Sequence, residues 1–168
     1  MKKEINPISC AGTVMNALKD GVLLVAAADG RVNPMTISWG YLGIEWGKPV
    51  FITVVRDSRF TKTLLDKNPE FTISVPVDGS AKKILALCGS KSGRDTDKIA
   101  ELGLTTVEPD EISVPGIKEL PLTLECRVRY AKKQEIADLP ADIAAGCYSD
   151  GDAHTAFYGE IVKAYIIE

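Results

Sequence analysis

The feature that most constrains the fold is a two-residue turn between two strand-like segments. Residues 22–28 form a continuous apolar run of strand length, and Asp29-Gly30 follows it directly. Asp-Gly between such segments is a strong hairpin signal, because the favoured turn needs positive φ values. The partner strand is predicted to begin over residues 35–39. This part of the chain is therefore predicted to be an antiparallel β-hairpin.

Further strands are predicted over residues 49–55, 71–77, 122–130 and 157–167. Apolar and polar residues alternate along 122–130, which predicts a strand buried on one face only. The predicted helices are short and cover residues 11–20, 58–67, 80–87 and 97–102. Gly21 is expected to end the first helix in a left-handed conformation, and Ser58 to cap the start of the second. Residues 88–95 are predicted to be a loop.

Many strands with hairpin turns and short helices predict a mainly β fold. The strands do not alternate regularly with long helices, which argues against a doubly wound parallel sheet. We therefore predict one domain over residues 1–168, folded as a closed or partly closed antiparallel barrel with a few short flanking helices.

Composition excludes several classes of protein. The net charge of −3 gives no general support for nucleic-acid binding. Residues 44–100 carry ten Lys/Arg and seven Asp/Glu, and this basic middle suits a small anionic ligand. No apolar run suggests a signal peptide, or approaches the roughly 20 residues that span a bilayer. Four scattered cysteines and one histidine predict a cytoplasmic protein with reduced thiols and no metal site.

A cluster of polar residues at the predicted helix start suggests a phosphate site. Arg56, Ser58, Arg59 and Thr61 lie around this start. The first turn of a helix leaves amide groups without internal partners, and its dipole favours an anion. The alternative is that Ser58 only caps the helix and the arginines are solvated.

Two other segments have residues that suit a ligand. Thr36 and Ser38 are expected on one face of their strand, where hydroxyls and backbone amides suit the polar edge of a planar ring. The alternative is an amphipathic strand with Trp39 in the core. The loop from Cys88 to Asp95 is rich in small and basic residues and either orders around a ligand or is an ordinary surface loop.

Motifs of several enzyme classes are absent. The chain has no GxGxxG, no P-loop and no GxSxG nucleophile elbow. His154 is the only histidine, so a mechanism that needs an imidazole would use it, whereas a structural role is the alternative. Cys88 has no Cys/His signature around it and is a weak nucleophile candidate.

Five short motifs occur in a family's order. They are Asn33-x-Met-Thr-x-Ser-Trp39, Arg56-x-Ser-Arg-x-Thr61, Phe71-Thr-x-Ser74, Ser92-Gly-Arg-Asp95 and His154-x-x-x-Tyr-Gly-Glu160. With them the chain resembles the flavin reductase-like FMN-binding proteins, particularly the flavoredoxin branch. The resemblance covers roughly residues 12–165.

The resemblance implies a six-stranded split β-barrel of Greek-key type, a homodimer, and FMN held near the dimer interface. The phosphate is expected at the helix start, the ring against the segment from Asn33 to Trp39, and the 91–94 loop over the cofactor. The implied cofactor-binding residues are Asn33, Met35, Thr36, Ile37, Ser38, Trp39, Arg56, Ser58, Arg59, Thr61, Cys88, Lys91, Ser92, Gly93 and Arg94. His154 matches a position that contacts flavin or nicotinamide in some relatives.

The resemblance implies an oxidoreductase in which FMN takes hydride from NADH or NADPH. The electrons would pass to free flavin, a ferric complex or another acceptor. A flavoredoxin-type electron carrier that serves protein partners is the first alternative, and a non-enzymatic flavin- or haem-binding split barrel is the second. Because flavin chemistry belongs to the cofactor, no protein acid, base or nucleophile is required.

Overall fold

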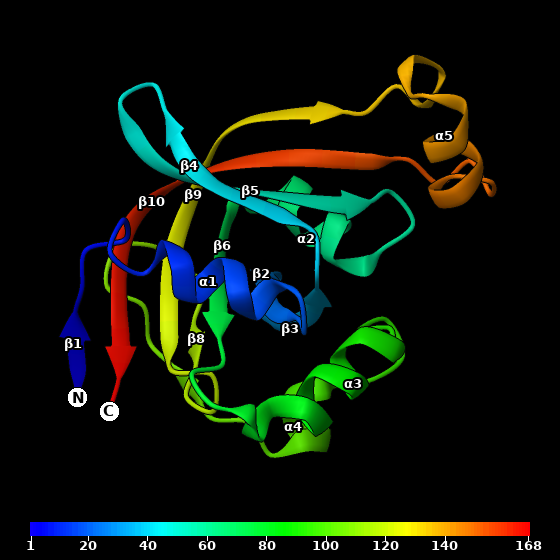
Figure 1. Ribbon diagram of the computed structural model, residues 1–168. Helices are drawn as coiled ribbons and strands as arrows, with labels where there is room; N and C mark the ends of the chain where they lie inside the picture. The colour runs from blue at the N-terminus through cyan, green and yellow to red at the C-terminus, as the bar shows by residue number, and fades with distance from the viewer.

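A computed structural model describes residues 1–168, apart from the side chain of Ser80. Eight strands form one antiparallel sheet in the order β3-β2-β6-β9-β10-β5-β4, with β1 paired to β10 (Figure 1). These strands are β1 (Lys2–Glu4), β2 (Val22–Ala28), β3 (Arg31–Ile37), β4 (Gly40–Glu45), β5 (Lys48–Arg56), β6 (Glu70–Val75), β9 (Leu122–Lys133) and β10 (His154–Ile167). A separate pair joins β7 (Thr106–Val107) to β8 (Gly116–Ile117).

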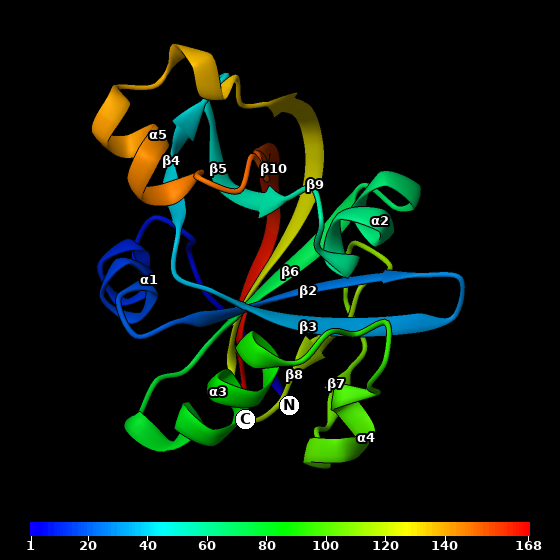
Figure 2. The ribbon, with the colours of Figure 1, turned by 90° about the vertical axis from the view of Figure 1, so that its right-hand side faces the viewer.

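Five helices lie around this sheet (Figure 2). They are α1 (Ala11–Leu18), α2 (Phe60–Lys67), α3 (Lys82–Ser90), α4 (Lys98–Leu102) and α5 (Ala141–Cys147). Two short 3-10 turns cover Gly79–Ala81 and Ile136–Asp138. The expected mainly β fold with short helices is confirmed.

The predicted barrel and its six strands need correction. In the described backbone β3 pairs only with β2, and β4 pairs only with β5, so the curled eight-stranded sheet keeps two edges and is not closed as a barrel. The chain passes from one edge to the other through Ser38 and Trp39, which follow the end of β3 and precede β4. Register shifts in the β9–β10 ladder accompany the bending of these long strands.

The predicted hairpin is confirmed, but its second strand was misplaced. Asp29 and Gly30 have φ values of 52° and 73°, as a tight turn with two left-handed residues requires. The partner strand starts directly after this turn and ends at Ile37, rather than beginning over residues 35–39. A second hairpin, with Trp46 at φ 52° and Gly47 at φ 72°, joins β4 to β5 and was not predicted.

Other boundaries differ for identifiable reasons. Helix α3 continues to Ser90, so the predicted 88–95 loop begins as helix. Strand β9 is buried on both faces over its first five residues, because residues around Asp110 cover the face that carries Thr123 and Glu125. Glu125 accepts hydrogen bonds from the amides of Asp110 and Glu111, both at 2.8 Å, which satisfies its buried carboxylate. β1, β7, β8 and α5 were also not predicted.

Two apolar clusters explain the continuous apolar run of β2. Val22, Leu24 and Ala26 pack into a cluster with α1 and α2, whereas Leu23 and Val25 on the opposite face pack toward α3. A central strand covered on both faces needs no polar alternation. The same arrangement brings the starts of α2 and α4 and the end of α3 to the neighbourhood of edge strand β3 (Figure 2).

Candidate functional site

One open cavity of about 340 Å³ collects the expected site residues. Its size lies in the range of ordinary ligand pockets, roughly 300–1,000 Å³. It is formed by β3, the end of β5, the start of α2, the end of α3, the 91–94 loop and the start of β10. All fifteen residues of the expected cofactor-binding set line it, together with His154. The sequence thus predicted which residues come together, and their binding of a ligand stays a prediction.

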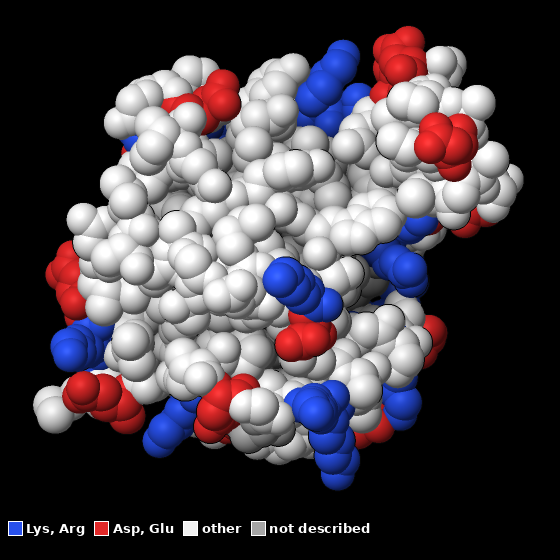
Figure 3. Space-filling view, viewed as in Figure 1, with Lys and Arg blue, Asp and Glu red and all other residues white. Residues whose placement is uncertain are grey.

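The cavity wall is strongly basic. Among the residues that line it, five are cationic and none is Asp or Glu: Arg56, Arg59, Lys91, Arg94 and Lys98. In Figure 3, basic side chains gather beside the hollow at the right of the view, between α5 and α3. A cleft lined by charges of one sign favours a ligand of the opposite sign. The lining therefore suits an anionic ligand.

Arg59 is available at the start of α2. It occupies the N-cap position, and the structure records neither a hydrogen bond nor an ion pair for its guanidinium. The amides of Phe60 and Thr61 follow it in the first turn, where a helix has no internal acceptor for them. Free amides, the helix dipole and an unpaired guanidinium together form an anion-binding arrangement.

Ser58 does not cap α2, contrary to the prediction. Its Oγ donates to Asp152 Oδ2 at 2.6 Å, and its amide donates to Oδ1 of the same carboxylate at 3.1 Å. A carboxylate is a stronger acceptor for the Ser58 hydroxyl and amide than a neutral group would be, and it draws Ser58 toward the 147–152 segment.

Arg56 also holds the 147–152 segment. Its guanidinium donates to the carbonyls of Cys147 at 2.7 Å and Asp152 at 2.8 Å, and it lies over the Tyr148 ring at 5.4 Å. The sequence predicted that the Arg56 guanidinium would bind a phosphate, but these contacts occupy its donors. Arg59 is therefore the arginine with more donors left for a ligand.

The 91–94 loop is docked against α2 and the first hairpin. Arg94 donates to the carbonyl of Ser58 at 2.9 Å, Arg31 donates to the carbonyl of Gly93, and Lys91 pairs with Glu101. A Cβ atom at Gly93 would lie 2.0 Å from Asn33 Oδ1, so only glycine permits this approach. The loop therefore lies directly against Asn33.

The polar residues of β3 are partly used within the protein. Buried Asn33 donates from Nδ2 to Thr61 Oγ1 at 3.0 Å, and Thr36 Oγ1 donates to the Leu85 carbonyl at 2.7 Å. Ser38 lies one residue beyond the end of the strand, and it lines the cavity together with Thr36. Trp39 is 46% exposed, which rules out the alternative that placed it in the core.

A hydrogen-bond chain orients His154 from outside the cavity. His154 Nδ1 lies 2.9 Å from the Tyr148 hydroxyl, which donates to Gln134 Oε1 at 3.0 Å. The hydroxyl oxygen therefore accepts from Nδ1–H, and Nε2 is the remaining ring nitrogen. Burial and then the charge of Arg56 lower the pKa of His154, which favours the neutral ring. The ring also lies 5.3 Å from that of Trp39.

Sequence reasoning missed five lining residues and both partners of His154. The five are Val54, Val55, Phe60, Gly89 and Lys98. Tyr148 and Gln134 had no signal, because their role depends on how α5 folds back. Cys88 lines the cavity as expected, but its side chain is buried. Burial raises the pKa of Cys88 to about 11, so it is a neutral thiol and no nucleophile.

The described residues hold neither a metal-ligand cluster nor a membrane-spanning helix. They contain no group of three or more His, Cys, Asp or Glu side chains arranged to hold a metal ion. Within the same residues, no helix has the length and apolar character needed to cross a membrane.

Comparisons with known proteins agree with the architecture. An uncharacterized protein of Archaeoglobus fulgidus is 30% identical over 139 residues, which cover 83% of this chain and 68% of that protein. The flavoredoxin of Methanosarcina acetivorans superposes with a TM-score of 0.68 at 28% identity, covering 88% of this chain and 68% of that one. The flavoredoxin of Desulfovibrio vulgaris (Miyazaki F) gives 0.70 at 25%, covering 88% and 69%.

The sequence model of the flavin reductase like domain matches residues 15–168, which is nearly the whole chain. The chain belongs to the flavin reductase-like family.

Proposed function

We propose that this chain binds FMN in the basic cavity and acts as an oxidoreductase. In this proposal NADH or NADPH supplies hydride, and the electrons pass to free flavin, a ferric complex or another acceptor. The observation that carries the proposal is a cavity with five cationic side chains, no carboxylate in its lining, and an open helix start. Hydride and electron transfer are chemistry that the flavin supplies when bound, so the protein needs only to bind, orient and tune it.

The residues present fit such a cofactor. Arg59 and the first amides of α2 are free donors for a phosphate, and Thr61 beside them is held by Asn33. Trp39, exposed at the mouth beside His154, offers an aromatic surface to a planar ring. The neutral His154 ring offers Nε2 to a ligand while Tyr148 holds Nδ1.

An electron carrier is the second candidate. It is favoured by the likeness to two proteins named flavoredoxins, at 28% and 25% identity. In that role the flavin exchanges electrons with protein partners, and a nicotinamide is a poor donor.

We propose further that the protein acts in the cytoplasm as a homodimer. The face that carries α1 and β4 has a wide area without charged side chains (Figure 3). Met15, Tyr41, Ile44 and Trp46 are exposed on these elements and on the turn between β4 and β5. A second copy on this face would cover the apolar side chains and edge strand β4. Light scattering should give about twice the chain mass of 18.1 kDa, and a concentration-independent monomer that binds FMN would contradict the dimer.

Anaerobic bleaching tests the reductase. The purified protein, saturated with FMN, should lose its flavin absorbance on addition of NADH or NADPH, and an acceptor should restore it. Reduction by dithionite defines the loss of absorbance that corresponds to full reduction of the flavin. His154→Ala should slow bleaching more than it weakens FMN binding, because its Nε2 is the imidazole nitrogen left for a ligand. Failure of both nucleotides to bleach, together with rapid reduction by a redox protein, would favour the carrier.

A further inference from the structure

A buried lysine lines the cavity without a carboxylate partner. Lys98, at the first position of α4, is 2% exposed, and the other lysines of the described chain are not buried. Its Nζ donates to the carbonyl of Pro34 at 2.8 Å and to that of Cys88 at 3.2 Å. Within the part of the chain that the structure describes, it forms no ion pair. An ammonium has three N–H donors, so one remains for a ligand.

The surroundings hold the charge in place but do not neutralise it. Cys88 lies in the last turn of α3, where carbonyls and the helix dipole favour a cation. Pro34 lies on edge strand β3, so its carbonyl has no neighbouring strand on that side. Burial lowers the pKa of Lys98, and the charge of Arg59 lowers it further. Negative charge arriving in the cavity would offset both effects.

We infer that Lys98 is a tuning residue of the cofactor site, whose ammonium contacts the flavin ring and favours the reduced form over the oxidised form. The inference rests on the proposed binding of FMN. Reduction adds two electrons and a proton to a neutral ring and leaves it anionic, so a nearby fixed cation stabilises the product of reduction selectively. The protein thereby sets the electron affinity of the cofactor with one buried charge.

The position of Lys98 points to the ring rather than to the phosphate. Its nearer partner, Pro34, belongs to the Asn33–Trp39 segment, against which the proposed site holds the ring, and its second partner, Cys88, lies at the end of α3. The phosphate half is the start of α2, with Arg59 and the free amides. Thr36 belongs to the same β3 segment, and its hydroxyl donates to the Leu85 carbonyl of α3. This hydrogen bond holds together the two elements that Lys98 contacts.

Two neutral substitutions test the inference. Lys98→Met removes the charge and the donors, whereas Lys98→Gln removes the charge and keeps donors for the Pro34 and Cys88 carbonyls. For each variant the dissociation constants of oxidised and reduced FMN are measured anaerobically, and the midpoint potential of the bound flavin is taken against a reference dye. Lys83→Met, which replaces an exposed lysine of helix α3, is the matched control.

In either neutral variant that folds, reduced FMN should lose about tenfold more affinity than oxidised FMN. That ratio corresponds to about 30 mV in the two-electron potential. The same shift should appear with riboflavin, which lacks the phosphate, and Lys98→Arg and Lys83→Met should keep the wild-type ratio.

Equal losses for both redox states would reduce Lys98 to a structural clamp and overturn the inference. A loss for FMN without one for riboflavin would assign Lys98 to the phosphate and also overturn it. Failure of the wild-type protein to bind FMN at all would instead refute the proposed function, and the inference with it.

Discussion

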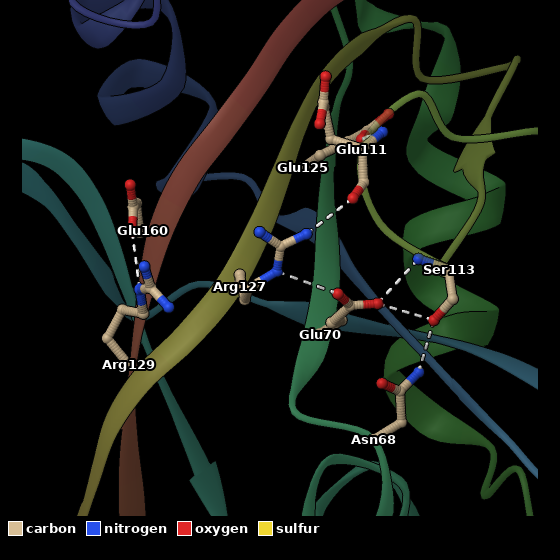
Figure 4. Close-up of polar contacts among 8 residues, drawn as sticks. All are labelled: Asn68, Glu70, Glu111, Ser113, Glu125, Arg127, Arg129 and Glu160. Atoms are coloured by element: carbon tan, nitrogen blue, oxygen red, sulfur yellow. Dashed lines mark hydrogen bonds and ion pairs between the residues drawn. The ribbon is translucent and has the colours of Figure 1, made fainter.

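Two charged regions of this molecule are built in opposite ways. On β6 and β9, Glu70 and Arg127 are paired: the Glu70 carboxylate accepts from the amide and hydroxyl of Ser113 at 2.8 Å and from Arg127 Nε at 3.3 Å (Figure 4). Arg127 also donates to the Glu111 carbonyl at 2.8 Å. In the cavity, five cationic residues line the wall without one carboxylate, and Arg59 has no recorded partner.

The difference separates a cluster in which acidic and basic side chains pair with one another from a cavity lining in which cations, Arg59 among them, face no carboxylate. The Glu70 cluster ties β6, β9 and the 111–113 segment together, and Arg129 with Glu160 at 2.7 Å does the same for β9 and β10. Clustering like charges in a cavity destabilises the free protein, and an anion relieves that repulsion. The basic cavity is therefore the better guide to function.

The largest expected effect comes from removing the unpaired guanidinium. Arg59→Ala should weaken FMN binding about 10- to 100-fold, because a charge-assisted contact contributes roughly 1.5–3 kcal/mol. Stability should hardly change, since Arg59 makes no recorded contact to lose. Titrations of FMN and riboflavin against the wild type, Arg59→Ala and the control Arg129→Ala measure this. An equal loss for both ligands would remove Arg59 from the phosphate site.

A smaller loss of FMN affinity is expected from a substitution that disturbs the cavity wall without changing its charge. In Gly93→Ala the new Cβ would lie 2.0 Å from Asn33 Oδ1 and 2.8 Å from Phe60 Cδ1. Overpacking should cost about 1–3 kcal/mol of stability, and FMN and riboflavin should both bind about tenfold more weakly. Gly12→Ala, with no neighbour within 4 Å of its Cβ, is the control. Unchanged affinity for both ligands would show that the Gly93 approach does not shape the site.

The smallest effect on FMN affinity is expected from a substitution in the Glu70 cluster. Burial raises the pKa of Glu70, but hydrogen bonds from Ser113 and Arg127 outweigh it and leave the pKa below its ordinary value of 4.5. The carboxylate therefore stabilises the fold above about pH 4.5, and this contribution is lost as the pH falls through the lowered pKa. Glu70→Gln should cost about 1–2 kcal/mol near neutral pH and less in acid, without altering FMN affinity.

Urea unfolding of the wild type and of Glu70→Gln between about pH 3 and pH 7 measures the difference in their stability. Glu45→Gln, at an exposed position, is the control. A difference in stability that stays constant over this range would mean that the charge of Glu70 plays no part.

Local turn chemistry made much of the fold predictable. Strand β2 was placed at its observed bounds because Asp29-Gly30 fixes where it ends. The residue set that the resemblance implied for cofactor binding lies together in one cavity. Predictions failed where tertiary contacts decide the local structure. Strand β4 was missed because it has no strong alternation of its own. Ser58 does not cap α2 because its hydroxyl donates to Asp152 instead.

Buried charge was the part that sequence could not reveal. A lysine that starts a helix is ordinarily solvated, so nothing in the sequence around Lys98 indicates that α3 and β3 enclose it. The link from His154 through Tyr148 to Gln134 likewise depends on the return of the 134–153 segment, which no short motif encodes.

The most direct test of the account compares FMN with riboflavin on the wild-type protein. The two ligands share the ring and differ in the phosphate, so their affinity ratio reports the phosphate contacts, which the proposal assigns to Arg59 and the start of α2. FMN should bind about 10- to 100-fold more tightly than riboflavin at low salt, and the ratio should shrink as salt is raised. Equal affinities, or a ratio that salt does not change, would contradict the claim that Arg59 and the basic cavity wall bind the phosphate of a flavin.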